Sequence, residues 1–284
     1  MKQPLLALGL LLSATTFNAH ASLTSYTGAG GAGLVYSSVS NVTWTQDANL
    51  LGTLETTLGY SNAINAIIAA SPTINGTANY YDTPAFSGHH SVTASDFAAG
   101  GLTSWFGAQA FVGYLNSISY GGSNQWRLPT AASITQHGFN VTDGELGQLY
   151  YSELNKLAFP GAGIGCSDGA WCDSTIFDWG LLGNGYSGLG TSGTAGLFSN
   201  AQVDTYWSGT EYAPIPSSAW GFGTGYGNQD LNNLYDQLYA WAVSPGQVSA
   251  VPVPGAVWLM GSGLLGLLSL KRRGHAEQFA LLVG

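Results

Sequence analysis

The most constraining feature of this chain is a run of twenty residues without a charge near its C-terminus, Val251 to Leu270 (VPVPGAVWLMGSGLLGLLSL). Twenty helical residues span roughly 30 Å, the thickness of the hydrocarbon core of a bilayer. Lys271, Arg272 and Arg273 follow at once, and three adjacent cations are costly to move into lipid. An ordinary core helix is amphipathic, so the segment predicts a C-terminal transmembrane helix with the cations on the cytoplasmic side.

The N-terminus has the pattern of a secretory signal peptide. Lys2 provides a positive charge, and Leu5 to Leu12 is an apolar run that is too short to span a bilayer. Ala19-His20-Ala21 has the small-x-small pattern that signal peptidase cleaves, which leaves Ser22 as the new N-terminus. We therefore predict a signal peptide over residues 1–21 and an exported, periplasmic body that is anchored in the inner membrane by its C-terminus.

The C-terminal segment resembles the PEP-CTERM sorting signal, which combines a Pro-x-Pro motif, an apolar helix and a basic cluster. The motif here is Pro252-Val253-Pro254, with Val253 where the family name implies Glu, and the basic cluster is Lys271 to Arg273. The resemblance implies an exosortase-type sorting enzyme as partner and an association with exopolysaccharide. It assigns 251–273 to the sorting signal and 274–284 to a short cytoplasmic tail. Whether the anchor is then removed, releasing the body to the cell surface or matrix, stays open.

The body, residues 22–250, is poor in charge and rich in glycine and aromatic residues. Charged residues make up 7% of the chain, against a usual share of about 25%, and 41 glycines are about twice the usual number. Hydrophobic residues at 45% and aromatic residues at 12% indicate a folded domain. The body holds fourteen carboxylates but only two cations, Arg127 and Lys156. Such a surface repels polyanions, which excludes nucleic acid as a partner and suits divalent cations or neutral glycans better.

Residue patterning within the body predicts an α+β fold. Short β-branched and aromatic segments predict a hairpin over Leu34–Trp44 and an antiparallel sheet from Tyr206 onward. Apolar residues at helical spacing predict a helix over Ser61–Ala70 and a longer, amphipathic one over Ser104–Ile118. A second main helix is expected between Thr142 and Leu157, because Thr142 and Glu145 have the spacing of a capping box.

Five blocks of the body also resemble the Lcl C-terminal domain family, a domain of unknown function in secreted bacterial proteins. The blocks are Val42 to Leu50, Gly121 to Thr130, Asp143 to Leu154, Tyr206 to Pro214 and Tyr239 to Gly246. Members are distantly similar to C-type-lectin-like and formylglycine-generating, sulfatase-modifying folds. The resemblance therefore implies a compact domain with a small twisted antiparallel sheet and two main helices. It implies no activity, because function does not follow from fold.

The only two cysteines, Cys166 and Cys172, are separated by five residues in CSDGAWC. In an oxidising compartment they most simply form a disulfide. The alternative is a metal or redox pair, but no further cysteine completes a zinc site and the spacing is not C-x-x-C. Nearby carboxylates could supply oxygen ligands to Ca²⁺, although a solvated acidic loop is favoured because no EF-hand is present. These carboxylates are Asp168, Asp173, Asp178 and Asp204.

Few other residues have the types needed for chemistry. The adjacent pair His89-His90 is expected to be solvated, because it lies in a polar stretch, and His137 is the only other histidine of the body. The alternative is a catalytic or metal-binding role, which lacks a carboxylate at metal-ligand spacing. Arg127 is expected to anchor the fold by pairing with Asp47 or Glu211, and the alternative is that it holds a ligand carboxylate. We expect no catalytic, cofactor or metal site.

Tryptophan has two possible roles, in the core or stacked on sugar rings. Trp105, Trp207, Trp220 and Trp241 have periodic positions typical of a core, whereas Trp171 and Trp179 lie in loop sequence and are better glycan platforms. The sequence therefore favours a non-catalytic protein of the envelope or extracellular matrix. The alternatives are a glycan- or calcium-binding lectin-like module and, last, a formylglycine-generating type of enzyme.

Overall fold

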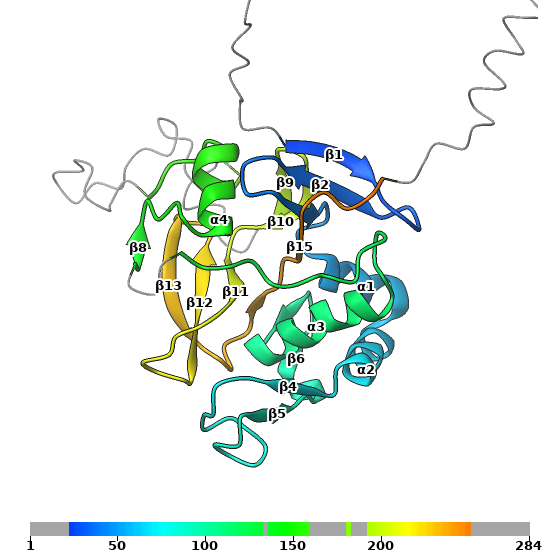
Figure 1. Ribbon diagram of the computed structural model, residues 1–284, viewed down its shortest axis with the longest axis vertical. Helices are drawn as coiled ribbons and strands as arrows, with labels where there is room; N and C mark the ends of the chain where they lie inside the picture. Colours follow the sequence, from blue (N-terminus) through cyan, green and yellow to red (C-terminus); the bar gives the residue numbers. More distant parts are fainter. Residues whose placement is uncertain (1–22, 133–135, 160–179, 183–191, 251–284) are drawn as a thin grey trace, which may run out of the picture.

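The computed structural model describes residues 23–132, 136–159, 180–182 and 192–250. In this part of the chain four sheets and a few helices form a mixed α/β fold in which sheets predominate (Figure 1). Helices α1 (Leu50–Leu58), α2 (Tyr60–Ala70) and α3 (Trp105–Ser117) gather beside the largest sheet.

The largest sheet has seven strands in the order β6-β7-β14-β11-β12-β13-β8. Its centre consists of β11 (Thr205–Glu211), β12 (Ser218–Gly223) and β13 (Asn228–Asn233), which pair in antiparallel fashion, as predicted for the segment after Tyr206. The pairing of β11 with β14 is parallel. The outer strands are short: β6 (Phe97–Ala98), β7 (Leu102–Thr103), β14 (Leu238–Tyr239) and β8 (Gly138–Phe139).

A four-stranded sheet brings the two ends of the described body together. Its order is β1-β2-β3-β15, all antiparallel. The strands are β1 (Leu23–Thr27), β2 (Gly33–Ser37), β3 (Val42–Thr45) and β15 (Val243–Pro245). The β2–β3 pair confirms the hairpin predicted over 34–44. Its turn contains Asn41 at φ 51°, a left-handed conformation that asparagine tolerates better than most residues.

Two further hairpins complete the sheets. One joins β9 (Ser192–Ala195) to β10 (Phe198–Gln202). The other joins β4 (Thr73–Asn75) to β5 (His89–Ser91) directly after α2, and its connecting loop spans residues 76–88. In Figure 1 this hairpin projects from the helical side of the molecule.

Helix α3 is the centre of the first core cluster and confirms the helix predicted over 104–118. Ser104 caps it, because its hydroxyl oxygen accepts a hydrogen bond from the Gly107 N–H. Helix α2 confirms the prediction for 61–70, whereas α1 was not predicted from the sequence. Helix α3 packs against α2, β4 and β11, and its buried side chains share a core cluster with those of α1.

Both core clusters contain several large, buried aromatic side chains. Trp105 and Trp207 lie in the first, and Trp241 lies in the second with Trp44 and Phe198, whose rings meet it edge to face. Trp220 is also buried, so the four tryptophans predicted for the core are confirmed there.

The predicted fold class was wrong in its proportions. Instead of one small sheet and two main helices, the described chain has four sheets. The helix expected from Thr142 is shorter than predicted, and it consists of α4 (Glu145–Gly147) followed by the π-helix η2 (Gln148–Glu153). Gly144, not Thr142, precedes α4, and a Cβ on it would lie 2.5 Å from the Ala132 nitrogen. Strands of two or three residues carry too little alternation to be recognised from pattern, which explains the underestimate of sheet.

The predicted transmembrane helix is likewise not supported. No helix in the described ranges is both long and apolar enough to cross a bilayer, and α3, at 13 residues, is too short. The apolar stretch 251–270 lies outside the described residues, as do the signal peptide with Ala21 and Ser22 and the sorting motif from Pro252 to Arg273.

Candidate functional site

Four aromatic side chains form a continuous row at the surface of the β4–β5 hairpin. Phe86, Tyr80 and Tyr81 belong to the 76–88 loop, and Tyr235 comes from the turn between β13 and β14. Neighbouring ring centroids are 6.4 Å apart from Phe86 to Tyr80, 5.6 Å from Tyr80 to Tyr81 and 4.7 Å from Tyr81 to Tyr235. Tyr80 is 71% exposed, Phe86 68% and Tyr235 39%. We refer to these four residues as the aromatic row.

The loop that carries the row is held by its own buried polar groups. The side-chain oxygen of Asn79 accepts a hydrogen bond from the Tyr81 N–H at 2.8 Å, which forms an Asx turn. The main-chain oxygen of Asn79 accepts from the Phe86 N–H, also at 2.8 Å. One carboxylate oxygen of Asp82 accepts from the N–H groups of Asn79 and Gly88, at 2.9 and 2.6 Å. Both side chains are buried, so the loop holds the rings in a preformed arrangement.

Phe86 has an unfavourable backbone conformation. Its φ of 62° lies in the left-handed region, which costs an ordinary L-residue about 1–2 kcal/mol. The side chain recovers little of this cost by burial, because it is largely exposed and its ring contacts Tyr80 only edge to face. An exposed aromatic residue at a strained position is the kind of outlier that points to function.

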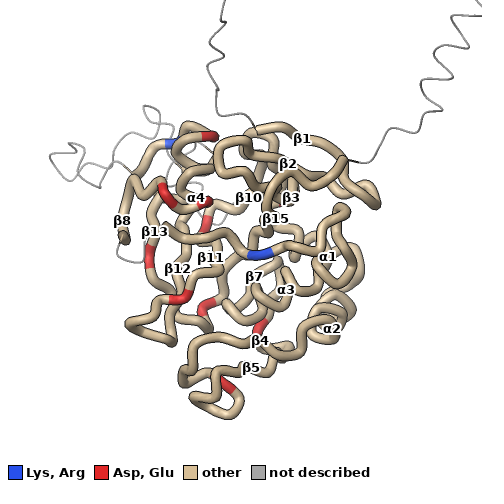
Figure 2. Tube along the Cα trace, in the orientation of Figure 1, with Lys and Arg blue, Asp and Glu red and all other residues tan. Residues whose placement is uncertain are grey.

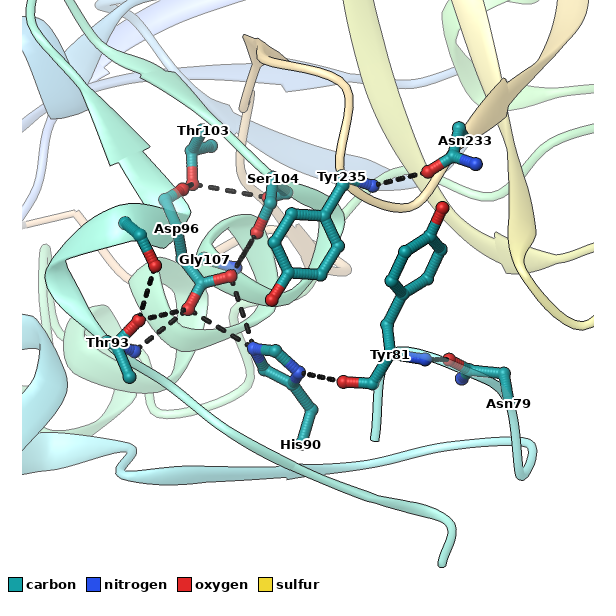
Figure 3. A network of polar contacts seen from close by, with 11 residues as sticks. Asn79, Tyr81, His90, Thr93, Asp96, Thr103, Ser104, Gly107, Asn233 and Tyr235 are labelled. Carbon is teal, nitrogen blue, oxygen red and sulfur yellow. Dashed lines mark hydrogen bonds and ion pairs between the residues drawn. The ribbon is translucent and has the colours of Figure 1, made fainter. Parts of the chain in front are cut away.

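A buried His90–Asp96 pair contacts two members of the row, Tyr81 and Tyr235 (Figure 3). Alternation along β5 turns His90 inward, where it is 2% exposed and stacks on Phe106 at 3.8 Å. Its Nδ1 lies 2.7 Å from the Tyr81 carbonyl oxygen, and its Nε2 lies 3.2 Å from both carboxylate oxygens of Asp96. The Tyr235 ring lies edge-on to the imidazole at 5.8 Å. The pair therefore connects the aromatic loop to the core.

Both nitrogens of His90 face groups that accept hydrogen bonds. A carbonyl oxygen and an ionised carboxylate have no proton to give, so with Asp96 ionised both ring nitrogens donate, which is the charged form of the imidazole. Burial by itself lowers the pKa of His90, but hydrogen bonds to Asp96 and Tyr81 and the charges of Asp96 and Asp82 outweigh it, so the pKa is raised. Burial raises the pKa of Asp96, and hydrogen bonds from His90, Thr93 and Ser104 more than reverse this, so it is lowered.

The same network fixes the start of α3. Asp96 ends the short 3₁₀ helix η1 (Ala94–Asp96), and the Ser104 hydroxyl donates to it at 2.7 Å while capping α3. Ser, His and Asp are the residue types of a hydrolase triad, but here the serine bonds to the aspartate and not to the histidine. All three side chains are buried, so no substrate can reach the hydroxyl. The arrangement stabilises structure and does not form a nucleophile.

Charged residues are few and scattered along the chain trace (Figure 2). Arg127 pairs with a carboxylate, as predicted, but the partner is Glu145 and not Asp47 or Glu211. The guanidinium forms a bidentate ion pair with Glu145, with both N–O distances at 2.7 Å. Glu145 also accepts from the Thr130 N–H at 2.8 Å. Arg127 pairs its backbone with Val243, so it ties the segment before α4 to β15.

The histidine prediction was half wrong. His90 is buried and ion-paired, whereas His89 and His137 are exposed, and His89 contacts the Asn75 side chain at 2.7 Å. Among the residues that the structure describes, no three His, Cys, Asp or Glu side chains gather as a metal site would require. Several predicted positions lie outside the described ranges: Cys166, Cys172, Asp168, Asp173, Asp178, Trp171 and Trp179. Asp204 is described, and it accepts from the Thr205 N–H.

The aromatic row was not recognised from the sequence. The signal for it is the segment Tyr80 to Phe86 (YYDTPAF), in which three aromatic residues flank Asp and Pro between two short strands. The row contains no tryptophan, the residue type considered for sugar stacking in the sequence. Its fourth member, Tyr235, is separated from this segment by about 150 residues of sequence.

No protein-family model matches this chain, and no similar curated protein or solved structure was found. The resemblances to the PEP-CTERM signal and to the Lcl C-terminal domain therefore stay predictions.

Proposed function

We propose that this chain is an exported, non-catalytic protein of the cell envelope or extracellular matrix that binds neutral exopolysaccharide through its aromatic row. The observation that carries the proposal is the row itself: exposed rings on a preformed loop. An aromatic face is apolar and electron-rich, and it packs well against the C–H groups on one side of a sugar ring. The tyrosine hydroxyls add hydrogen-bonding groups at the edges of the same surface.

Charge supports a neutral polymer over an acidic one. The chain has a formal net charge of −9, and the aromatic row contains no cation. An acidic polysaccharide would be repelled and would find no positive partner at the row. A neutral polysaccharide needs none, because stacking and hydrogen bonding supply its contacts.

Export and sorting are part of the same proposal and rest on the sequence. The signal-peptide pattern before Ser22 and the motif Pro252-Val253-Pro254 with the basic cluster Lys271 to Arg273 support an exosortase-type route. Fractionation of the native cells with intact-mass analysis tests it. We expect a mature N-terminus at Ser22 and an extracytoplasmic body, and a full-length chain in the cytosol would contradict this part of the proposal.

Binding through the row is tested by affinity electrophoresis in native gels that contain a soluble neutral polysaccharide. We expect retardation of the wild type and an apparent Kd about fivefold weaker for Tyr80→Ala and for Phe86→Ala, since one aromatic contact contributes about 1 kcal/mol. Phe139→Ala is the matched control, because this phenylalanine is also partly exposed but lies on β8. Equal retardation of all four proteins, or no retardation of the wild type by any neutral polymer, would refute the proposal.

A further inference from the structure

A cleft of about 800 Å³ lies between α3, β4 and β11, separate from the aromatic row. This volume is within the range of roughly 300–1,000 Å³ that is typical of sites for small organic ligands. The indoles of Trp105 and Trp126 line it, and both are buried and held by hydrogen bonds from their ring N–H groups to main-chain oxygens. The cleft therefore has a rigid aromatic lining.

Polar groups that can contact a ligand line the same cleft. Gln109 on α3 is half-buried, and its side-chain amide makes no hydrogen bond to any residue that the structure describes. Thr210 accepts from the Ala131 N–H, which leaves its hydroxyl proton available. Asn75 uses its side-chain oxygen for His89 and keeps its NH₂ group. Together these groups offer both donors and acceptors, which is what hydroxyl groups require.

The charged groups that line the cleft leave no free cation for a ligand. Arg127 lines it, but its guanidinium is neutralised by the bidentate pair with Glu145. Glu211 also lines it, and both of its carboxylate oxygens accept from the Thr77 N–H, at 3.2 and 3.0 Å. An anionic ligand would meet Glu211 without an unpaired cation to balance it. The lining therefore disfavours anionic ligands, and its neutral amide and hydroxyl groups suit an uncharged ligand with many hydroxyl groups.

We infer that this cleft is a second binding site, which takes an uncharged short oligosaccharide between α3, β4 and β11. The inference rests on the proposed function for the class of ligand, but it uses residues that are distinct from the aromatic row. Gln109 provides the central hydrogen bonds, Thr210 and Asn75 provide further ones, and the buried indoles form the rigid floor of the cleft.

Two variants test the site without disturbing the core. Gln109→Ala removes the free amide at a helix position where alanine is favourable. Gly209→Leu fills the cleft, because a Cβ at Gly209 has only ordinary contacts, 3.4 Å to Leu128 Cβ and 3.8 Å to Gln109 Nε2. Asn65→Ala, an exposed amide on α2, is the matched control for the loss of an amide.

The measurement is isothermal titration of the full-length chain with uncharged and uronic-acid-containing oligosaccharides of three to six rings. The chain is kept in a detergent without a sugar head group, because of its apolar stretch 251–270. We expect Kd to weaken about fivefold for Gln109→Ala and at least about tenfold for Gly209→Leu. We expect Asn65→Ala and Tyr80→Ala to bind as the wild type does, and uronic-acid oligosaccharides to bind more weakly.

Three outcomes would overturn the inference: no heat of binding with any uncharged oligosaccharide, a loss in Tyr80→Ala equal to that in Gln109→Ala, or tighter binding of the uronic acids. These outcomes are distinguishable from failure of the proposed function. Retardation in polymer gels depends on the aromatic row, whereas binding of short oligosaccharides depends on Gln109 and Gly209.

Discussion

At the scale of single residues, the environment of a side chain determines its role more than its type does. Phe86 would be an ordinary core residue elsewhere, but here it is exposed at a positive φ. His90 and His89 are neighbours in sequence, and alternation along β5 buries only the former. The residues that carry the aromatic row are therefore defined by backbone conformation and strand direction.

The backbone at position 86 provides a stability test. Glycine occupies left-handed conformations without steric cost, whereas alanine keeps the cost that phenylalanine has. We expect Phe86→Gly to be more stable than Phe86→Ala by about 1 kcal/mol, or about 2–4 °C in melting temperature for a domain of this size. Differential scanning calorimetry checks this, and both variants should bind polysaccharide equally poorly. Identical melting temperatures would mean that position 86 is not strained.

At the scale of elements, the His90–Asp96 pair joins three pieces of chain that are separate in sequence. His90 lies on β5, Asp96 ends η1, and Ser104 caps α3. The Tyr81 carbonyl and the Tyr235 ring bring the aromatic loop and the β13–β14 turn to the same imidazole. Protonation of one histidine is therefore linked to the stability of the loop that carries the aromatic row.

The pH dependence of unfolding follows from the direction of this shift. Because the folded-state pKa of His90 is raised, its contribution is fully present below the unfolded-state pKa of about 6.5 and is lost as pH rises through the folded-state value. Asp82, Asp96 and Tyr235 are the titratable groups that face the imidazole. We expect the melting temperature to fall as the pH rises above 6.5 in the wild type and in His89→Gln.

His90→Gln should lose this decline and be destabilised by about 3 kcal/mol, because it leaves Asp96 buried without its partner. If this variant does not fold, nitrogen-15 NMR of the wild-type imidazole replaces it, and the pKa of His90 should lie above its ordinary value of about 6.5. A pKa of His90 below that value would contradict the assignment of the charged pair.

At the scale of the whole molecule, the scarcity of charge is the dominant property. Charged residues make up 7% of the chain, and the cations of the body are Arg127 and Lys156. Arg127 is partly exposed, and its charge is paired with Glu145. The surface can therefore interact with a polymer mainly through aromatic rings and neutral polar groups, and long-range attraction contributes little.

Salt provides the test at this scale. Stacking and neutral hydrogen bonds are not screened by ions, so we expect the Kd for a neutral polysaccharide to change less than about twofold between roughly 50 and 500 mM NaCl. Affinity electrophoresis at the two concentrations measures the change. A tenfold loss at high salt would show that ion pairs carry the binding, and the proposed mechanism would then be wrong.

The sequence by itself determined the features that depend on local pattern or on composition. These are the two helices α2 and α3, the β2–β3 hairpin, the low content of charged residues, and the burial of Trp105, Trp207, Trp220 and Trp241. Helical periodicity and alternation act over a few residues, so they can be recognised without knowledge of distant contacts. The expected helix from Thr142 failed where Gly144 packs against Ala132, a contact between segments that periodicity does not register.

Only the tertiary structure decided which distant residues meet. It paired Arg127 with Glu145, buried His90 against Asp96, and placed Tyr235 beside Tyr81 to complete the aromatic row. It also assembled the cleft from α3, β4 and β11. Such partners are selected by the packing of whole elements, because a charge or a ring can reach any complementary group that the fold brings within a few ångströms.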